Sequence, residues 1–337
     1  MSAIDARADA GHFRLGMLFA VASAFAFGMS GPLAKALMEA GWTPTAAVTA
    51  RLAGGAFAMA VFASIIRPGW VGEALAHRKT VISYGLVPIA GAQLCYYNAV
   101  AHLSVGVALL LEYTAPILVV GWLWATTKRP PGKLTLAGVA LAVAGIMLVL
   151  DVFAGARINS VGVSWGLAAA ICAACYFMMS DEAVSDGDGL HPITLAAGGL
   201  VIGAVAVAGL GLSGVMPMTF STHSTVVAGL TLPWFIPVIA LAIIPTAVAY
   251  TLGIFGVARL RPRFASLVGL AEVLFAVLIA WGFLGEAITA TQAFGGGVVL
   301  LGLTLARLGD RVDAVLEAGW PDLPPPQPHA EQAIGSN

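Results

Sequence analysis

Long apolar runs alternate with short polar connections along most of the chain. Ten of these runs come close to the roughly 20 residues that a helix needs to cross the hydrocarbon layer of a bilayer. Their approximate bounds are 15–36, 45–66, 80–100, 104–126, 134–151, 161–180, 191–213, 233–257, 264–284 and 289–307. Of the connections, only 214–232 is long enough to form a separate loop. The pattern predicts an all-α polytopic membrane protein with ten transmembrane helices.

Both ends of the chain are more polar than the runs between them. Residues 1–14 mix Asp with Arg and are predicted to be a cytoplasmic N-terminal segment. The run that follows is too long for a signal peptide and further runs come after it, so we expect it to remain as a helix. Residues 308–337 are predicted to be a cytoplasmic disordered tail, because the stretch from Trp320 onward is polar and rich in proline.

Lys and Arg gather in every other connection, which sets the predicted orientation. Cytoplasmic connections carry an excess of these residues. If the N-terminus is cytoplasmic, the cytoplasmic set holds Arg67, Arg78, Lys79, Lys128, Arg129, Lys133, Arg259, Arg261, Arg263, Arg307 and Arg311, and the other set holds little beyond Arg157. The connection 180–189 has no Lys or Arg and lends no support, but acidic residues count little in this rule. We expect a multi-pass protein of the cell (plasma or inner) membrane with both termini cytoplasmic.

The chain also repeats itself. An offset of 157 positions, which places Pro88 on Pro245, brings further Trp and Gly residues into register without a gap. The other pairs of this kind are Trp124 with Trp281, Gly138 with Gly295, and Gly145 with Gly302. The pairs divide the chain into two five-helix halves, 15–151 and 161–307. Because five is odd, the second half must run in the opposite direction, which predicts the inverted repeats that secondary carriers use to alternate access.

Composition agrees with a lipid environment and removes several classes of function. Of the 337 residues, 59% are hydrophobic and 10% charged, and the net charge is −1; the mean hydropathy is +0.93. This balance provides no basic surface for nucleic acid. Cys95, Cys172 and Cys175 lie in apolar runs and are predicted to pack there, not to bind metal. No glycine-rich phosphate-binding loop is present, so transport without ATP and without a cofactor is expected.

Four ionisable side chains within the apolar runs are the main candidates for function. They are Lys35, Arg51, Glu112 and Glu272. A charge at this depth costs roughly 2.5–3.5 kcal/mol on insertion scales, so each needs a partner or a watery cavity. Glu112 is expected near mid-depth. Pro116 removes the helical partner of the Glu112 carbonyl, so carboxylate and free carbonyl form one polar notch of the kind carriers use for ions or ammonium groups.

Two interpretations of these charges stay open. Glu112 either serves substrate binding or proton coupling, or it holds helices together as the ion-pair partner of Arg51 or Lys35. Arg51 has a guanidinium that can fork onto a carboxylate, that of Glu112 or that of a substrate. Lys35 either takes part in the site or extends to the outer headgroups. Glu272 either serves gating or coupling, or pairs structurally.

Polar residues of the third run complete the candidate site. Gln93 and Tyr97 are four positions apart and share one helical face, so they can line a cavity. Tyr96 and Asn98 belong either to this lining or to the belt at the membrane interface.

Prolines and glycines are expected to shape the helices. Pro88 and Pro245 free the carbonyls of Tyr84 and Leu241, which predicts kinks that act as hinges or cavity walls. The glycine groups are predicted to be small-residue faces for close helix packing. They are Gly162 with Gly166, Gly199 with Gly203, and Gly295, Gly296 and Gly297 with Gly302.

A family resemblance is carried by three segments: SGPLAKALMEAGWTP (30–44), NAVAHLSVGVALLLEYTAPILV (98–119) and LVGLAEVLFAVLIAWGFLGEAITATQAFGGGVVLLG (267–302). They resemble the EamA branch of the drug/metabolite transporter superfamily, and within it the group containing the threonine/homoserine exporter. The likeness covers 15–307, and its most specific element is LGE (284–286) followed by the glycine-rich last run. The resemblance implies a ten-helix, two-repeat secondary carrier that moves small metabolites, usually outward. The family often has Glu-Pro in the ninth run, whereas here Val273 follows Glu272.

The sequence therefore predicts a secondary exporter of small metabolites that works by alternating access. Amino acids or related zwitterions are the favoured substrates, and proton coupling and a homodimer are left open. The alternatives are an integral-membrane enzyme and a passive channel. An enzyme would need buried histidines or a metal cluster, and the apolar runs hold essentially no histidine. The expected partners are the small-molecule substrate and the lipid bilayer, with no nucleic acid, metal or catalytic residue.

Overall fold

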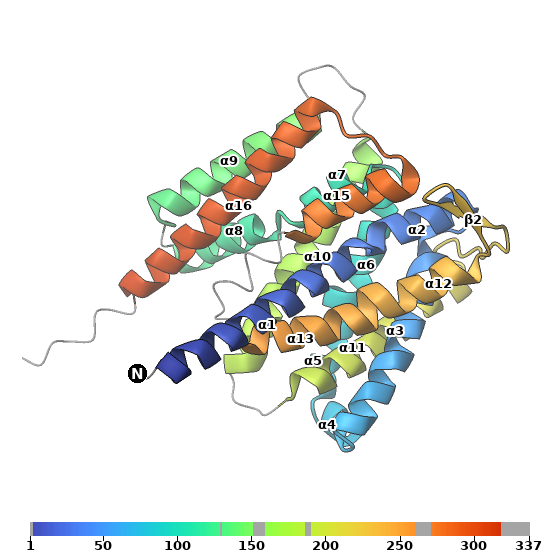
Figure 1. The fold of residues 1–337 in the computed structure, drawn as a ribbon, viewed down its shortest axis with the longest axis horizontal. Coiled ribbons are helices and arrows are strands. Elements are labelled where there is room, and N and C mark those ends of the chain that lie inside the picture. The colour runs from blue at the N-terminus through green and yellow to red at the C-terminus, as the bar shows by residue number, and fades with distance from the viewer. Residues whose placement is uncertain (1–2, 129, 151–158, 186–189, 260–270, 318–337) are drawn as a thin grey trace, which may run out of the picture.

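The computed structural model describes residues 3–128, 130–150, 159–185, 190–259 and 271–317. Its described elements are helices and one two-stranded hairpin (Figure 1). The predicted fold is confirmed as mostly helical. The loop 214–232 adds a short hairpin that the sequence did not predict, in which β1 (Thr225–Val227) pairs antiparallel with β2 (Leu230–Leu232). Ala228 and Gly229 both have positive φ, the backbone that a tight two-residue hairpin turn requires.

The described residues of the first half form nine α-helices and one π-helical turn. They are α1 (Ala3–Gly28), α2 (Ser30–Glu39), α3 (Pro44–Ile66), α4 (Trp70–Ala76), α5 (Arg78–Tyr84), the π-helical η1 (Gly85–Gly91), α6 (Ala92–Val100), α7 (Val105–Glu112), α8 (Ala115–Thr127) and α9 (Lys133–Val149). The turn η1 joins α5 to α6 in one continuous helical rod. The second half forms α10 (Ser160–Ser185), α11 (Pro192–Leu212), α12 (Phe235–Ala242), the π-helical η3 (Ile243–Val248), α13 (Ala249–Arg259), α15 (Ala271–Leu284) and α16 (Ala290–Glu317).

The predicted apolar runs fall on these helices. Five stretches of the described residues are long and apolar enough to cross a membrane: Arg14–Glu39, Pro44–Ile66, Val105–Thr126, Pro192–Leu212 and Phe235–Gly253. Four shorter apolar helices accompany them: Lys133–Val149, Ser160–Tyr176, Ala271–Leu284 and Ala290–Ala306. The chain is thus a multi-pass, mostly helical protein, while the count of ten transmembrane helices stays a prediction. Residues 264–270 of the ninth run lie outside the described residues.

The ends of the chain are more helical than predicted. α1 begins at Ala3, inside the N-terminal segment 1–14. α16 continues to Glu317, so the predicted disordered tail 308–337 is corrected over its first part. Its remainder, 318–337, lies outside the described residues. No proline interrupts α16 before Glu317, so the helix can continue beyond its apolar part.

Four helical rods are interrupted, and a proline accompanies each interruption. Proline has no N–H, so the carbonyl four residues before it loses its helical partner. α1 ends at Gly28, four residues before Pro32, and α7 ends at Glu112, four residues before Pro116. Pro88 and Pro245 instead lie within the π-helical turns η1 and η3. The predicted deformations at Pro88 and Pro245 are confirmed in the form of π turns, which occupy matching positions at the offset of 157.

Close glycine packing, also predicted from the sequence, is confirmed between α9 and α16. A Cβ atom placed on Gly138 would lie 2.3 Å from the backbone nitrogen of Ala306, and one on Gly302 would lie 2.4 Å from that of Ala142. The two helices therefore run with their backbones in contact, side by side in Figure 1. Only glycine leaves room for this approach.

We expect Gly302→Ala to destabilise the protein by about 1–3 kcal/mol, because the added methyl group forces two backbones apart. The measurement is the thermal unfolding midpoint of the purified protein in detergent. Gly297→Ala is the matched control on the same helix, since a Cβ there meets nothing within 4 Å. Equal midpoints for the two variants would contradict the packing argument.

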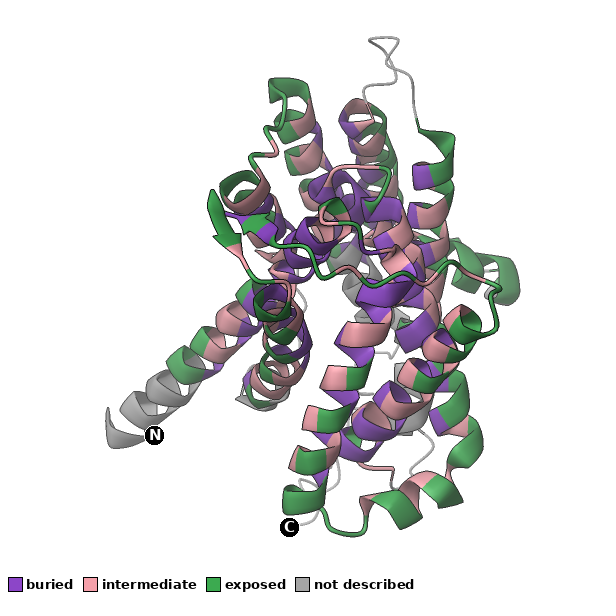
Figure 2. Ribbon diagram, turned by 90° about the vertical axis from the view of Figure 1, so that its right-hand side faces the viewer, coloured by how far each residue is buried: buried purple, intermediate pink, exposed green. Residues whose placement is uncertain are grey.

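Large apolar side chains cover the outside of the bundle. Figure 2 shows the buried residues gathered on the inward sides of the helices, with exposed residues on the outward sides. The exposed set includes Phe57, Ile65, Trp122, Trp281 and Phe294. Such a surface would aggregate in water, and it matches contact with lipid tails.

Candidate functional site

Arg51, on α3, is a buried guanidinium at the junction of the two halves. Its side chain is 3% exposed. All three nitrogens donate hydrogen bonds: Nη1 to Ser30 Oγ at 2.6 Å, to Tyr97 OH at 3.3 Å and to Gln93 Oε1, Nε to Thr246 Oγ1 at 3.3 Å, and Nη2 to the Pro245 carbonyl at 3.1 Å. The acceptors come from α2, α6 and η3, so this one side chain joins three elements to α3.

All of these acceptors are uncharged oxygens. Tyr97 adds its ring, whose centroid lies 5.8 Å from the Arg51 Cζ atom. Ser30 and Tyr97 share a further hydrogen bond of 3.0 Å. Within the described residues, no carboxylate forms an ion pair with Arg51. The cluster is therefore a fully connected polar network, the form in which a buried charge is tolerated.

Glu112 lies at the interruption between α7 and α8. The backbone tightens there: the Thr114 N–H donates to the Leu111 carbonyl at 3.1 Å, and the Ile117 N–H donates to the Thr114 carbonyl at 2.8 Å. The helix break predicted from Pro116 is confirmed. The Glu112 side chain is partly buried and forms no hydrogen bond or ion pair with any residue that the structure describes. Among the described residues, its carboxylate is therefore left without a partner at the break.

Glu272, at the start of the described part of α15, approaches the same break. Its Oε2 accepts a hydrogen bond of 2.7 Å from the hydroxyl of Tyr113, the residue after Glu112. The charges of Glu112, Glu272 and Arg51 are near enough to interact with one another. The centre of the bundle therefore holds two carboxylates and one guanidinium, which come from the end of α7, from α15 and from α3.

Lys35 lies away from this centre, at the end of the bundle that carries the hairpin. Its Nζ pairs with Glu286 and donates to the Leu103 carbonyl at 3.1 Å. Glu286 also accepts the Val105 N–H at 3.1 Å. Neither expectation for Lys35, a place in the central site or extension to the headgroups, foresaw this partner. The predicted pairing of Glu112 with Arg51 or Lys35 is not observed. Lys35 pairs with Glu286, and Arg51 donates to uncharged oxygens.

The structure brings some of the predicted polar residues to Arg51 and leaves others out. Gln93 and Tyr97 both contact the guanidinium, as their spacing on one helical face predicts. Asn98 instead donates to the Leu94 carbonyl of its own helix at 2.7 Å. Tyr96 is 4% exposed, which places it inside the bundle and not in an interfacial belt.

Four residues of these networks did not stand out in the sequence: Ser30, Tyr113, Thr246 and Glu286. Each lies next to a feature that did. Ser30 begins the segment 30–44, Thr246 follows Pro245, and Glu286 ends the LGE element. Neutral residues in an apolar run give little signal, and the Glu286 pairing spans 251 positions of sequence.

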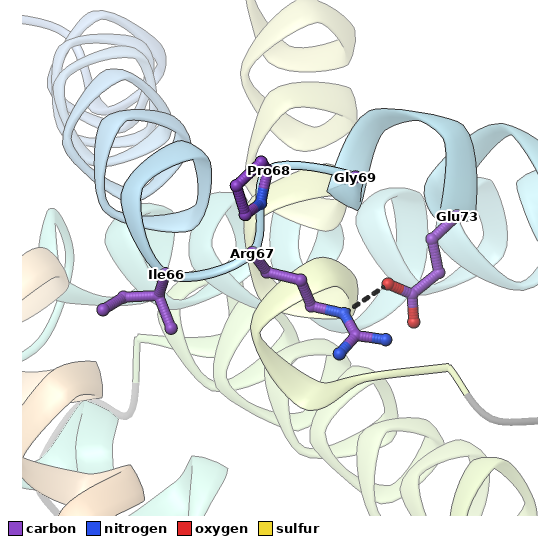
Figure 3. Close-up of a pocket in the computed structure, with 5 residues that line it drawn as sticks. All are labelled: Ile66, Arg67, Pro68, Gly69 and Glu73. Atoms are coloured by element: carbon purple, nitrogen blue, oxygen red, sulfur yellow. Dashed lines mark hydrogen bonds and ion pairs between the residues drawn. The ribbon is translucent and has the colours of Figure 1, made fainter.

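A second polar cluster lies at the opposite end of the bundle, on α4. Glu73 accepts hydrogen bonds from Arg67 Nε at 2.7 Å, from Thr194 Oγ1 at 2.8 Å and from the His191 N–H at 2.7 Å. His191 and Thr194 begin α11, so Glu73 binds a helix N-terminus of the second half. A surface hollow of about 460 Å³ opens beside it, lined by the connection Ile66 to Glu73 (Figure 3). The Glu73 carboxylate already accepts three hydrogen bonds from the protein, so its part at the hollow is structural.

The Glu73 cluster predicts a defined pH dependence of stability. The hydrogen bond from Arg67, followed by those from His191 and Thr194, lowers the pKa of Glu73 from 4.5 to about 2. A lowered folded-state pKa means that the stabilisation is complete above the unfolded value and is lost as the pH falls from 4.5 towards 2. We expect the difference in unfolding midpoint between wild type and Glu73→Gln to be constant from pH 6 to 8 and to shrink below pH 4.5. A difference that changes between pH 6 and 8 would contradict this assignment.

The cysteines belong to the packing between helices. Cys95 and Cys172 lie on α6 and α10, two helices that pack against each other. The described part of the chain holds no group of three or more His, Cys, Asp or Glu that could bind a metal ion.

Known proteins are similar to this chain in sequence along most of its length. The model of the EamA-like transporter family matches residues 14–151 and again 160–308. The uncharacterized inner membrane transporter YicL of Salmonella typhimurium is 24% identical over 311 residues, covering 89% of this chain and 98% of that protein. The threonine/homoserine exporter RhtA of Escherichia coli K12 is 28% identical over 275 residues, covering 80% of this chain and 83% of that protein.

A solved crystal structure has a related fold. It superposes with a TM-score of 0.55 at 18% identity, over 88% of this chain and 98% of the solved one. The two family matches together take in the elements that hold Arg51, Glu112 and Glu272. The chain belongs to the EamA-like transporter family and is a multi-pass membrane transporter of small metabolites.

Proposed function

We propose that the protein is a secondary exporter of amino acids or related zwitterions, and that Glu112 is the centre of its substrate site. This proposal rests on the Glu112 carboxylate, which lies at a helix break inside the bundle and has no partner in the part of the chain that the structure describes. An ionisable side chain in the membrane interior is energetically costly, so such residues commonly mark functional sites. The similarity to RhtA, which is named for the export of threonine and homoserine, supports the substrate class.

The proposed architecture is ten transmembrane helices in two inverted five-helix repeats, 15–151 and 161–307, in an inner membrane. Two observations support it. The family model matches the chain twice, once in each half. The π turns η1 and η3 deform the rods at positions that correspond at the offset of 157. Both termini would then be cytoplasmic, the hairpin would face outward, and the Glu73 cluster would face the cytoplasm.

Alternating access would act through the connections between the halves. Lys35 and Glu286 join the halves at the hairpin end, and Glu73 with Thr194 joins them at the other. Opening on one side requires one of these contacts to break while the other holds. The Glu112 carboxylate can be neutralised either by a proton or by an ammonium group. The proton and the substrate therefore exchange at one carboxylate, and the entry of protons drives the substrate outward.

Uptake into inside-out membrane vesicles tests this proposal. The probes are labelled amino acids, with nucleobases and cationic dyes as comparison classes, each with and without an imposed pH gradient. We expect gradient-dependent accumulation of at least one amino acid, and no accumulation in vesicles that lack the protein. Accumulation only of another class would overturn the substrate assignment. Movement that never exceeds equilibrium would overturn secondary transport in favour of a passive channel.

A further inference from the structure

The hydrogen bonds of Arg51 leave it poorly suited to bind a substrate carboxylate. A bidentate grip on a carboxylate needs two parallel N–H groups of the guanidinium. Here Nε donates to Thr246, Nη1 donates to three side-chain oxygens, and Nη2 donates to the Pro245 carbonyl. At most one N–H, on Nη2, is left over. A substrate carboxylate could bind Arg51 in this bidentate way only if hydrogen bonds that join α3 to α2, α6 or η3 were broken.

Lys35, the other cation predicted for the site, is also engaged. Lys35 lies at the hairpin end, where its ammonium group is held by Glu286 and by the Leu103 carbonyl. The Glu286 carboxylate in turn caps the start of α7 through the Val105 N–H. Lys35 is therefore neither free nor close to the helix break that carries Glu112.

The acidic groups at the centre are in the opposite situation. Glu112 has no hydrogen bond or ion pair among the described residues, and Glu272 accepts only from the neutral hydroxyl of Tyr113. Arg51 interacts with both carboxylates electrostatically, but it binds neither. The centre thus holds two carboxylates and one guanidinium, so one more positive charge would balance it.

We infer that the site recognises its substrate through the amino group alone, at Glu112 and Glu272, and that Arg51 is a positioning residue which joins the halves and does not touch the substrate. The inference rests on the proposed function, of which it specifies the ligand chemistry. It departs from the symmetric picture in which a carboxylate and a guanidinium each bind one end of a zwitterion. The substrate carboxylate adds little affinity, while the ammonium group is indispensable.

Competition by matched analogues tests the inference on the wild-type protein. The three compounds are L-threonine, 1-amino-2-propanol, which lacks the carboxylate, and 2,3-dihydroxybutanoate, in which a hydroxyl replaces the amino group. Each competes with labelled L-threonine for exchange in proteoliposomes; if another amino acid of the panel is the better substrate, the same trio is built on it. We expect the amine to compete within about threefold of the amino acid, and the hydroxy acid to be weaker by roughly tenfold or more, since a charge-assisted hydrogen bond is lost.

A hydroxy acid that competes as well as the amine would overturn the inference, and so would an amine roughly tenfold weaker than the amino acid. Either result leaves the transporter proposal intact, because the labelled amino acid still exchanges. If no amino acid exchanges at all, the proposed function fails and the inference fails with it. The two failures are therefore distinguishable.

Arg51→Lys gives a second, independent readout. If Arg51 only positions helices, the substitution weakens L-threonine and 1-amino-2-propanol by the same factor, and their ratio of inhibition constants stays within about twofold of wild type. If Arg51 binds the carboxylate, only L-threonine is weakened and the ratio changes by roughly tenfold. The wild-type competition decides the matter even if the variant does not fold.

Discussion

Replacing Glu112 by glutamine should lower kcat/KM for transport by roughly 10- to 100-fold while leaving the protein folded, the loss expected when a charge-assisted hydrogen bond of about 1.5–3 kcal/mol is removed. Glutamine keeps the size and the hydrogen-bonding oxygen but carries no charge for an ammonium group or a proton. Because Glu112 has no partner among the described residues, its charge stabilises no contact that the substitution would break. Function should fail while stability holds.

The measurement pairs exchange in proteoliposomes with the thermal unfolding midpoint of the same preparation. Glu39→Gln is the matched control, since Glu39 is exposed at the end of α2 and lies outside the site. Glu112→Asp keeps the charge on a shorter side chain and should retain part of the activity. A Glu112→Gln protein that loses stability in step with activity would show that the carboxylate holds helices together.

Replacing Arg51 by methionine should cost about 3 kcal/mol or more of stability, the largest loss expected for a single side chain of this site. Methionine fills much of the volume but leaves oxygens of Ser30, Gln93, Thr246 and Pro245 without their donor. Each buried polar group without a partner costs about 1–3 kcal/mol. Since the acceptors lie on both halves, the halves should also separate more easily.

Thermal unfolding in detergent measures this loss, with Arg78→Met as the control because Arg78 is exposed on α5. Arg51→Lys should fall between wild type and methionine, since an ammonium group keeps the charge but reaches fewer of the acceptors. An Arg51→Met protein as stable as the control variant would contradict the network described for α2, α3, α6 and η3.

Much of the fold follows from local rules and was predictable. Apolar runs became helices because a helix satisfies its own backbone in lipid. Interruptions followed from Pro88, Pro116 and Pro245, because a proline removes one N–H wherever it stands. Gln93 and Tyr97 were predicted to share a face from a spacing of four, and both reach Arg51. Polar extensions of α1 and α16 and the short hairpin were missed, because their boundaries depend on weak local preferences.

The partners of the charges could not be read from the sequence in the same way. Arg51 had two carboxylates to choose from in the apolar runs, yet it is held by neutral oxygens up to 195 positions away. Lys35 is held by Glu286, which lies 251 positions away in a connection. The apolar composition shows that each charged side chain needs a partner. It does not show which partner, because several pairings would neutralise the charges equally well.

The sequence by itself determined the membrane environment, the helical rods, the points at which they break and the residue types that had to matter there. Each of these depends on interactions within a few positions of the chain or on the solvent in which the chain lies. Only the tertiary structure decided that Arg51 is engaged, that Lys35 belongs to one end of the bundle, and that Glu112 alone of these charges keeps its carboxylate unpaired among the described residues. The physical reason is that ion pairs and hydrogen bonds act over a few ångströms, and which groups come that close is set by how the helices pack.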